Sequence, residues 1–143
     1  ASMFFQQFSV SIENRHGSLT DFTQLLGENG VDLIALSIAD TTNFGILRAI
    51  VSDNEKTLKV VRDKGYTANL TEVLAVAVPD VPGGLAGVLQ LLRDNDISVE
   101  YLYSFVRRVG NDAIIIFRVD QPERAGNLLR DKGVRLLEQG EIA

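Results

Sequence analysis

The sequence contains an internal repeat, which restricts the possible folds more than any other feature of the chain. When Gly17 is placed on Gly83, 66 positions further on, apolar residues on both sides fall into register. The matched pairs include Leu19 with Leu85, Phe22 with Val88, and Asn29 with Asn95. After small shifts in the loops, residues 62–65 and 130–133 both read Arg-Asp-Lys-Gly. A repeat of this length is too long for a solenoid unit and suits a small domain.

Hydrophobic periodicity and turn residues predict the same order of elements in each copy. In the first copy we expect a strand at 8–12, a helix from 18 to 30, strands at 32–41 and 45–52 joined by a turn at 42–43, a helix from 54 to 65, and a strand at 66–70. In the second copy we expect a strand at 74–78, a helix from 84, a hairpin over 97–119 that turns at 110–112, and a helix from 122 to 133. Ser18 and Asn54 are the expected N-caps of the first copy's helices, because their side-chain oxygens can accept from backbone N–H groups.

The order βαββαβ predicts an α+β protein made of two tandem ferredoxin-like sandwiches, each an antiparallel sheet with its helices on one face. We expect the domains to cover residues 3–70 and 71–143, with Thr71 and Glu72 as a short linker. A domain of about 70 residues buries only about 60% of its unfolded surface, and one face of its sheet has no helix. We therefore expect the two domains to pack together and the chain to form a homodimer.

Composition and charge exclude several classes of function. The chain of 143 residues has no cysteine and one histidine, so disulfides, thiolate nucleophiles and cysteine-bound zinc are excluded. The formal net charge of −5 argues against general affinity for nucleic acid or anionic membrane. No apolar run reaches the roughly 20 residues of a membrane helix, and no signal peptide is recognised. We expect a cytoplasmic protein that carries no cofactor.

The loop between the first strand and the first helix of each copy is the expected ligand site. Glycine at 17 and 83 allows the backbone to approach a ligand, and the helix start behind it offers unpaired N–H groups to a carboxylate. Asn14 or Asp80, three residues before the glycine, could hold an ammonium group. These charges together match an α-amino acid. The candidate residues of the loops are Asn14, Arg15, His16, Gly17, Ser18 and Leu19, and Asp80, Val81, Pro82, Gly83, Gly84 and Leu85.

The stretches 12–33 and 79–99 resemble the ACT domains found in the regulatory parts of phosphoglycerate dehydrogenase and aspartokinase, and the resemblance covers nearly the whole chain. The resemblance implies regulatory binding of an amino acid or similar small molecule, usually between a loop and a neighbouring strand of a paired domain. It adds Asp32 and its counterpart Ser98 to the candidate ligand residues. The serine-binding members have histidine where this chain has Ile12 and asparagine where it has Asp32, which argues against serine as the ligand.

Other functions are compatible with the fold but poorly supported by the residues. An RNA-recognition domain shares the βαββαβ order, but its third strand carries aromatic residues, whereas the third strands here, 45–50 and 113–118, are almost wholly aliphatic. An enzyme would need a nucleophile and base, and no such pair can be assembled. The alternatives that remain are an amino-acid-binding regulatory protein, which could act on a metabolic enzyme or regulator, and an interaction or oligomerisation module without a ligand.

Overall fold

The computed structural model describes residues 3–13, 15–40, 44–105 and 110–141. Contacts between Cα atoms divide these residues into two compact units. We call residues 6–71 the N-terminal unit, and residues 3–5 together with 72–141 the C-terminal unit. The βαββαβ order of two ferredoxin-like sandwiches is confirmed.

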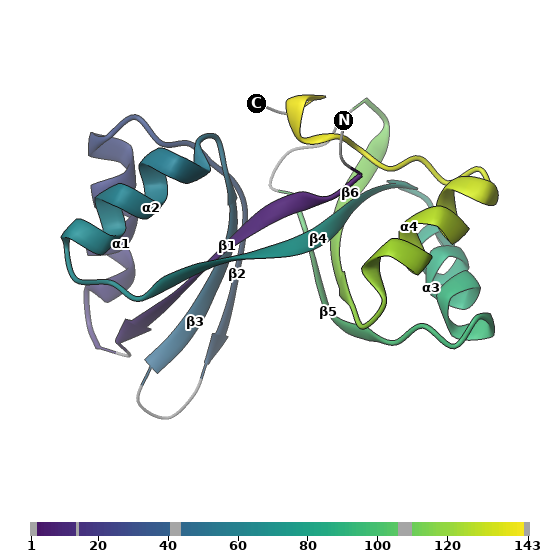
Figure 1. Ribbon diagram of the computed structural model, residues 1–143, viewed down its shortest axis with the longest axis horizontal. Coiled ribbons are helices and arrows are strands. Elements are labelled where there is room, and N and C mark those ends of the chain that lie inside the picture. The colour runs from purple at the N-terminus through teal and green to yellow at the C-terminus, as the bar shows by residue number, and fades with distance from the viewer. Residues whose placement is uncertain (1–2, 14, 41–43, 106–109, 142–143) are drawn as a thin grey trace. The chain divides into compact units, whose positions relative to one another are not determined.

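The N-terminal unit is an antiparallel sheet with two helices on one face (Figure 1). Its elements are β1 (Phe5–Glu13), α1 (Ser18–Glu28), β2 (Leu33–Asp40), β3 (Phe44–Val51), α2 (Asn54–Asp63) and the first residues of β4 (Ala68–Pro79). The strand order is β2-β3-β1, and the chain just before β4 lies along the other side of β1, where the Ser11 N–H donates to the Thr67 carbonyl at 3.2 Å.

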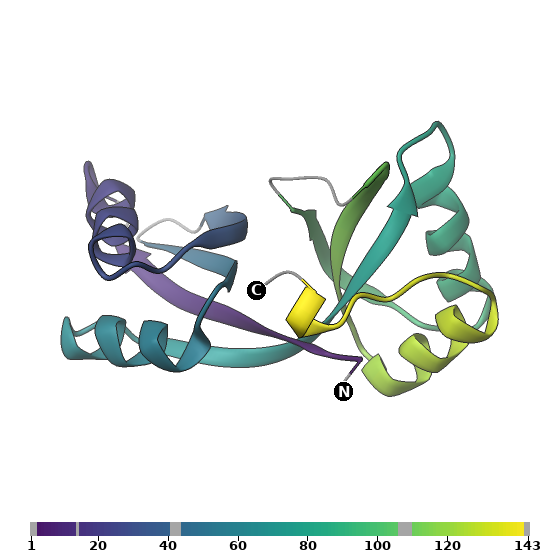
Figure 2. The same cartoon turned by 90° about the horizontal axis from the view of Figure 1, so that it is seen from above.

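The C-terminal unit repeats this arrangement, again with both helices on one face of the sheet (Figure 2). It consists of the remainder of β4, α3 (Gly84–Asp94), β5 (Val99–Ser104), β6 (Asp112–Val119), α4 (Pro122–Asp131) and a 3-10 turn (Gln139–Glu141). The strand order is β4-β6-β5. Residues 135–137 take the place of the fourth strand, because the Leu137 N–H donates to the Ala75 carbonyl at 2.8 Å.

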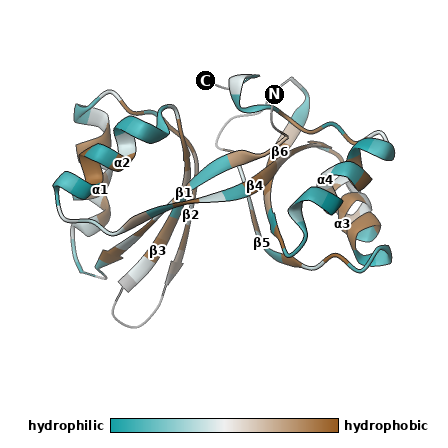
Figure 3. Ribbon diagram, in the orientation of Figure 1, coloured by the Kyte–Doolittle hydropathy of each residue, from teal (hydrophilic) through white to brown (hydrophobic). Residues whose placement is uncertain are grey.

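Each unit has its own hydrophobic core between helices and sheet. In the N-terminal unit the core is built around Phe8, Phe22, Leu26, Leu47 and Val61, which are at most 1% exposed. In the C-terminal unit Leu74, Leu92, Phe117 and Leu129 play the same part, and Met3 and Phe4 pack against them. Segments of α1 and α3 alternate between hydrophobic and hydrophilic, as amphipathic helices do (Figure 3). Burial of each large side chain contributes about 1.5–3 kcal/mol to stability. Because each unit buries several such side chains in a core of its own, the chain forms two compact units.

The expected caps of the first two helices are wrong by one residue. The N-cap of α1 is Gly17, not Ser18, and no side chain of the described residues caps this helix. The N-cap of α2 is Asp53, not Asn54, and its carboxylate accepts from the Lys56 N–H at 3.1 Å. An N-cap residue has non-helical backbone angles, so the position of the cap depends on where the chain turns into the helix.

Thr71 and Glu72, which were expected to form a short linker, are part of a strand. Thr71 and Glu72 lie inside β4, which runs without interruption from Ala68 to Pro79 and includes both the last strand of the first copy and the first strand of the second. The division between the two compact units therefore falls within a strand and not in a loop. The turn expected at residues 42–43 lies outside the described residues.

Candidate functional site

The loops before α1 and α3 have the same backbone conformation. Gly17 has φ 85° and ψ −8°, and Gly83 has φ 85° and ψ −7°. In each loop the first residue of the helix donates its N–H to the carbonyl three residues back, from Ser18 to Arg15 and from Gly84 to Val81. A residue with a side chain would pay about 1–2 kcal/mol in this left-handed conformation, so glycine at both positions has a conformational reason.

Ser18, the first residue of α1, carries the most unusual polar atom of this loop. The residue is only 6% exposed, and its hydroxyl has no hydrogen-bond partner in the described part of the chain. A buried hydroxyl without a partner costs about 1–3 kcal/mol. The hydroxyl lies where the first N–H groups of α1 are also free of intrahelical acceptors. Unused hydrogen-bonding capacity is thus concentrated at the start of α1.

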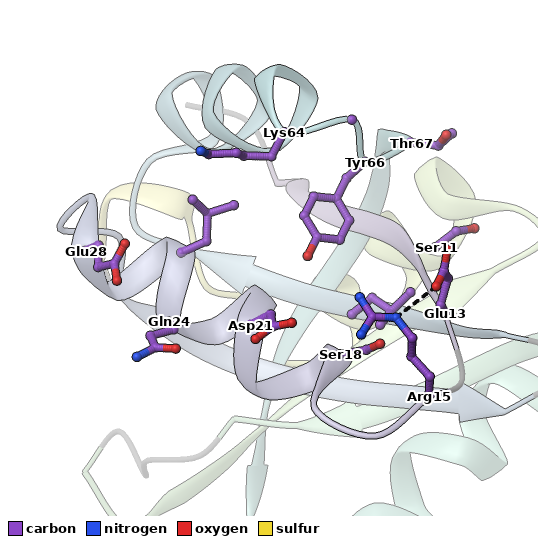
Figure 4. Close-up of a pocket in the computed structure, with 13 residues that line it drawn as sticks. Ser11, Glu13, Arg15, Ser18, Asp21, Gln24, Glu28, Lys64, Tyr66 and Thr67 are labelled. Carbon is purple, nitrogen blue, oxygen red and sulfur yellow. Dashed lines mark hydrogen bonds and ion pairs between the residues drawn. The ribbon is translucent and has the colours of Figure 1, made fainter.

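Ser18 lines a groove of about 580 Å³ between α1 and the segment that leads from α2 to β4 (Figure 4). Tyr66 extends its ring into this groove and packs edge-on against Phe22, with ring centroids 5.3 Å apart. Asp21 and Gln24 border the groove from α1, and Lys64 borders it from the end of α2. The groove is therefore open, polar and formed entirely by the N-terminal unit.

Charges of both signs lie at the end of the groove nearest the loop. The Arg15 guanidinium donates to the Glu13 carboxylate at 2.9 Å, and both side chains are mostly exposed. Asp21 adds a second carboxylate in the first turn of α1. An exposed ion pair of this kind contributes little to stability, so both partners remain available to a charged ligand.

A second hollow, of about 170 Å³, adjoins the groove at the same helix start. It is lined by apolar residues of three strands and of α1, namely Ile12, Leu19, Ile38, Gly45 and Leu47. Ser18, Glu13 and Arg15 border this hollow as well as the larger groove. A polar and an apolar hollow therefore meet at Ser18.

The corresponding helix start in the C-terminal unit is closed. Gly84 replaces Ser18, and a Cβ atom built on Gly84 would lie 2.1 Å from the carbonyl oxygen of Pro79 and 3.4 Å from Val78. Real Cβ atoms essentially never come within 3.0 Å of such an atom. The start of α3 therefore lies closer to the preceding strand than the start of α1 can, since Ser18 has a real Cβ.

Asp32 and Ser98 do not lie near the loop of their own unit. Asp32 precedes β2, and β2 runs parallel to β1 because both pair antiparallel with β3. The loop follows the far end of β1, so roughly 20 Å of strand separates Asp32 from it. Asp32 is instead joined to the end of β3 through Ser52, whose hydroxyl accepts from the Asp32 N–H at 3.0 Å. Ser98 has the same place in its unit, where its N–H donates to Asp120 at 3.0 Å.

The remaining candidates lie on the surface of the two loops. Asn14 lies outside the described residues. Arg15, His16, Asp80, Val81, Pro82 and Gly83 are exposed, and Leu85 is half-buried. Sequence reasoning missed Glu13, Asp21 and Tyr66, although the first two are carboxylates within four residues of Gly17 and could have been noticed as partners for an ammonium group.

Metal and membrane sites have no support in the residues that the structure describes. No group of three or more histidine, cysteine, aspartate or glutamate side chains there could hold a metal ion. No helix within the described ranges is long and apolar enough to cross a membrane.

Comparison with known proteins identifies the family. The family model of the ACT domain pair matches residues 3–143. Protein BT0572 from Bacteroides thetaiotaomicron is similar in structure, with 38% sequence identity and a TM-score of 0.88 over 94% of this chain and 92% of that one. No curated protein matches.

More distant structures share the fold. The regulatory subunit of aspartate kinase from Thermus thermophilus has 14% identity and a TM-score of 0.62 over 91% of this chain and 93% of its own. The regulatory subunit from Thermus flavus has 14% identity and a TM-score of 0.60 over the same shares. The resemblance of the two loops to ACT domains is thereby confirmed. With two βαββαβ units and a family match across both of them, the chain belongs to the ACT-domain family as an ACT domain pair.

Proposed function

We propose that this chain is a regulatory protein that binds a free α-amino acid, or a close analogue, at the loop before the first helix of one or both units. The observation that carries the proposal is the buried Ser18 hydroxyl, which lacks a partner in the described structure and lies at an uncapped helix start beside a polar groove. Buried polar groups in proteins are nearly always hydrogen-bonded, so a ligand is the expected partner.

The start of α1 suits the carboxylate of an amino acid. The N–H groups of Leu19 and Thr20 belong to the first turn and have no intrahelical acceptor, and the helix dipole favours negative charge there. The Ser18 hydroxyl can donate to the same carboxylate, and the Arg15 guanidinium adds positive charge at the rim. This set resembles the anion sites that helix N-termini form in many proteins.

Three carboxylates line the groove, and two of them, Glu13 and Asp21, are close in sequence to Ser18 and suit the ammonium group of the amino acid. Glu13 ends β1 and Asp21 lies in the first turn of α1, so the two flank Ser18. Each charge-assisted hydrogen bond contributes roughly 1.5–3 kcal/mol. About three such bonds, less the cost of immobilising a small ligand, correspond to micromolar affinity.

Asp32 and Ser98 enter this proposal only through pairing. Since neither reaches the loop of its own unit, a contact with the ligand would have to come from a neighbouring domain. We propose a homodimer in the cytoplasm that brings such a domain to the loop and acts on a metabolic enzyme or regulator, as the word regulatory in the names of the aspartate kinase subunits suggests. The chain itself is proposed to bind and not to catalyse.

Titration calorimetry with each of the twenty amino acids tests the proposal, on the native chain and on Gly17→Leu and Gly83→Leu. We expect one or a few amino acids to bind at micromolar concentration and at least one of the two variants to weaken binding. If no amino acid binds below millimolar concentration, the proposed function is wrong. Sedimentation that nevertheless finds a stable dimer would then favour an oligomerisation module without a ligand.

A further inference from the structure

We infer, building on the proposed function, that the ligand is held by the N-terminal unit at Ser18 and has a branched aliphatic side chain, as in valine, leucine and isoleucine. The inference names both the unit that binds and the chemical class of its ligand. It follows from two hollows that share Ser18, Glu13 and Arg15: the larger adds mostly polar residues to these three, and the smaller adds only apolar ones.

The apolar hollow has the size of an aliphatic side chain. Its volume of about 170 Å³ equals that of five to six water molecules at about 30 Å³ each, and a methyl or methylene group occupies about as much space as one water. The hollow is thus far smaller than the 300–1,000 Å³ of a typical pocket for a larger organic ligand. A side chain of three or four carbon atoms fits, with room left for its Cα.

The walls of this hollow include hydrophobic surface that the fold leaves uncovered. Leu19 is 40% exposed and Ile38 is 45% exposed, whereas Leu47 and Ile12 behind them are almost fully buried. Ile38 pairs with Leu47 across β2 and β3, so it lies on the helix side of the sheet although α1 does not cover it. An aliphatic ligand side chain between Leu19 and Ile38 would remove this surface from water.

Ser18 connects this hollow to the charged groove. It borders both, together with Glu13 and Arg15, so one molecule can place its α-carbon at Ser18. Its carboxylate and ammonium groups then lie in the groove, and its side chain lies among Ile12, Leu19 and Ile38. A purely polar ligand would leave the hollow unfilled, and a purely apolar one would leave the Ser18 hydroxyl without a partner.

The C-terminal unit lacks both parts of this arrangement. Its helix start offers no hydroxyl, since Gly84 stands in the place of Ser18 against the Pro79 carbonyl. The charged pair is absent as well, because Pro79 and Val81 stand at the positions of Glu13 and Arg15. Ala113 pairs with Val78 as Gly45 pairs with Ile12, so a methyl group occupies a position that is open in the N-terminal unit.

Calorimetry with L-valine, L-leucine, L-isoleucine, L-alanine, L-serine, L-aspartate and L-phenylalanine tests the class of ligand on the native chain. Each buried methylene group strengthens binding about fourfold, so valine should bind about 15-fold more tightly than alanine. We expect a stoichiometry of one ligand per chain. Tightest binding of serine, aspartate or phenylalanine, or two equivalent sites per chain, would overturn the inference while leaving the proposed function intact.

Two substitutions test the site itself. Ile38→Ala should weaken the best aliphatic ligand about tenfold, and Ser18→Ala should weaken every amino acid that binds, also about tenfold. Leu102→Ala, a half-exposed leucine on β5, and Ser104→Ala, an exposed serine on the same strand, are the matched controls and should leave affinity unchanged. Unchanged affinity in both Ile38→Ala and Ser18→Ala, with folding verified by circular dichroism, would contradict the site.

If none of the seven amino acids binds to the native chain, the inference is overturned. The proposed function fails as well only if none of the twenty amino acids binds. Binding that survives Ser18→Ala but is lost in Gly83→Leu would assign the ligand to the C-terminal unit and would overturn the inference alone.

Discussion

The loops before α1 and α3 differ in chemistry although their backbones coincide. Both turn through a glycine at φ 85°, and both close with the same hydrogen bond from the first residue of the helix. Around this common turn, polar residues of the N-terminal unit are replaced in the C-terminal unit. The pairs are Ser11 and Ala77, Glu13 and Pro79, Arg15 and Val81, Ser18 and Gly84, Asp21 and Gly87, and Tyr66 and Val134.

The two units share the residue that the fold requires and differ in the polar residues around it. Each unit needs the glycine turn, because the chain must enter the helix in a left-handed conformation. The polar residues are not needed to fold, since the C-terminal unit forms the same elements without them. This difference supports the proposal that the polar set of the N-terminal unit binds a ligand.

The largest expected effect on stability comes from replacing Gly84 of the C-terminal unit by serine, the residue that the N-terminal unit has at the corresponding position 18. Gly84→Ser would bring a Cβ within 2.1 Å of the Pro79 carbonyl, so the backbone must move, at a cost of about 3 kcal/mol. Urea unfolding measures the loss. Gly87→Ser is the control, because no described atom lies within 4 Å of a Cβ at this helical position. Equal unfolding midpoints for the two variants would show that the start of α3 is not closed.

Replacing the glycine of either turn should cause a smaller loss of stability, and the loss should be the same for both turns. Gly17→Ala and Gly83→Ala should each destabilise the chain by about 1–2 kcal/mol, because φ 85° strains a residue with a Cβ. Space is not the cause, since a Cβ at either position meets no described atom within 4 Å. Gly27→Ala, within α1, should instead stabilise by about 0.5–1 kcal/mol. A marked difference between the two turn variants would contradict their shared backbone.

Removing the Ser18 hydroxyl should have the opposite effect and stabilise the chain. In the absence of ligand, Ser18→Ala should stabilise the chain by about 1 kcal/mol, because it removes a buried polar group that has no partner in the described structure. Thr57→Val is the matched comparison and should destabilise by a similar amount, since the buried Thr57 hydroxyl donates to the Asp53 carbonyl at 2.6 Å. Thermal unfolding of the two variants distinguishes them. A destabilised Ser18→Ala would mean that the hydroxyl has a structural partner.

The smallest effect on stability is expected at the rim. Arg15→Val copies the residue of the other loop and should change the free energy of unfolding by less than about 0.5 kcal/mol, since the ion pair with Glu13 is exposed. Amino-acid affinity should nevertheless fall and should become less sensitive to salt, because one charge of the site is lost. Calorimetry at two salt concentrations measures this. A salt dependence equal to that of the native chain would exclude Arg15 from the site.

The elements and the glycine turns could be predicted because they are local. Alternating apolar residues such as Phe8, Val10 and Ile12 determine a strand wherever it pairs, and the repeat doubled this signal. The union of two predicted strands into β4 was missed because Thr71 and Glu72 are polar and stand between the two apolar runs. Polar residues are tolerated in a strand when they face solvent, and sequence alone does not tell which residues do.

The candidate site was predicted only in part because its remaining residues come from distant segments. Gly17 and Ser18 belong to a recognisable turn, whereas Tyr66 reaches the groove from beyond α2. The hydroxyl of Ser18 was expected to cap a helix. In the described structure it is buried and has no hydrogen-bond partner, which the sequence alone does not show. The distance from Asp32 to the loop likewise follows from the strand register, which no local pattern determines.

The membership of residues 3–5 in the C-terminal unit bears on how the protein is made. Met3 and Phe4 pack against a core whose other members begin at Leu74 and continue to Leu136. During synthesis at about 5–20 residues per second, Met3 and Phe4 must wait for roughly ten seconds before these neighbours are made. Residues 6–71, which carry the whole polar groove, are complete well before that. A nascent chain can thus assemble its candidate binding surface while the core against which residues 3–5 pack is still being translated.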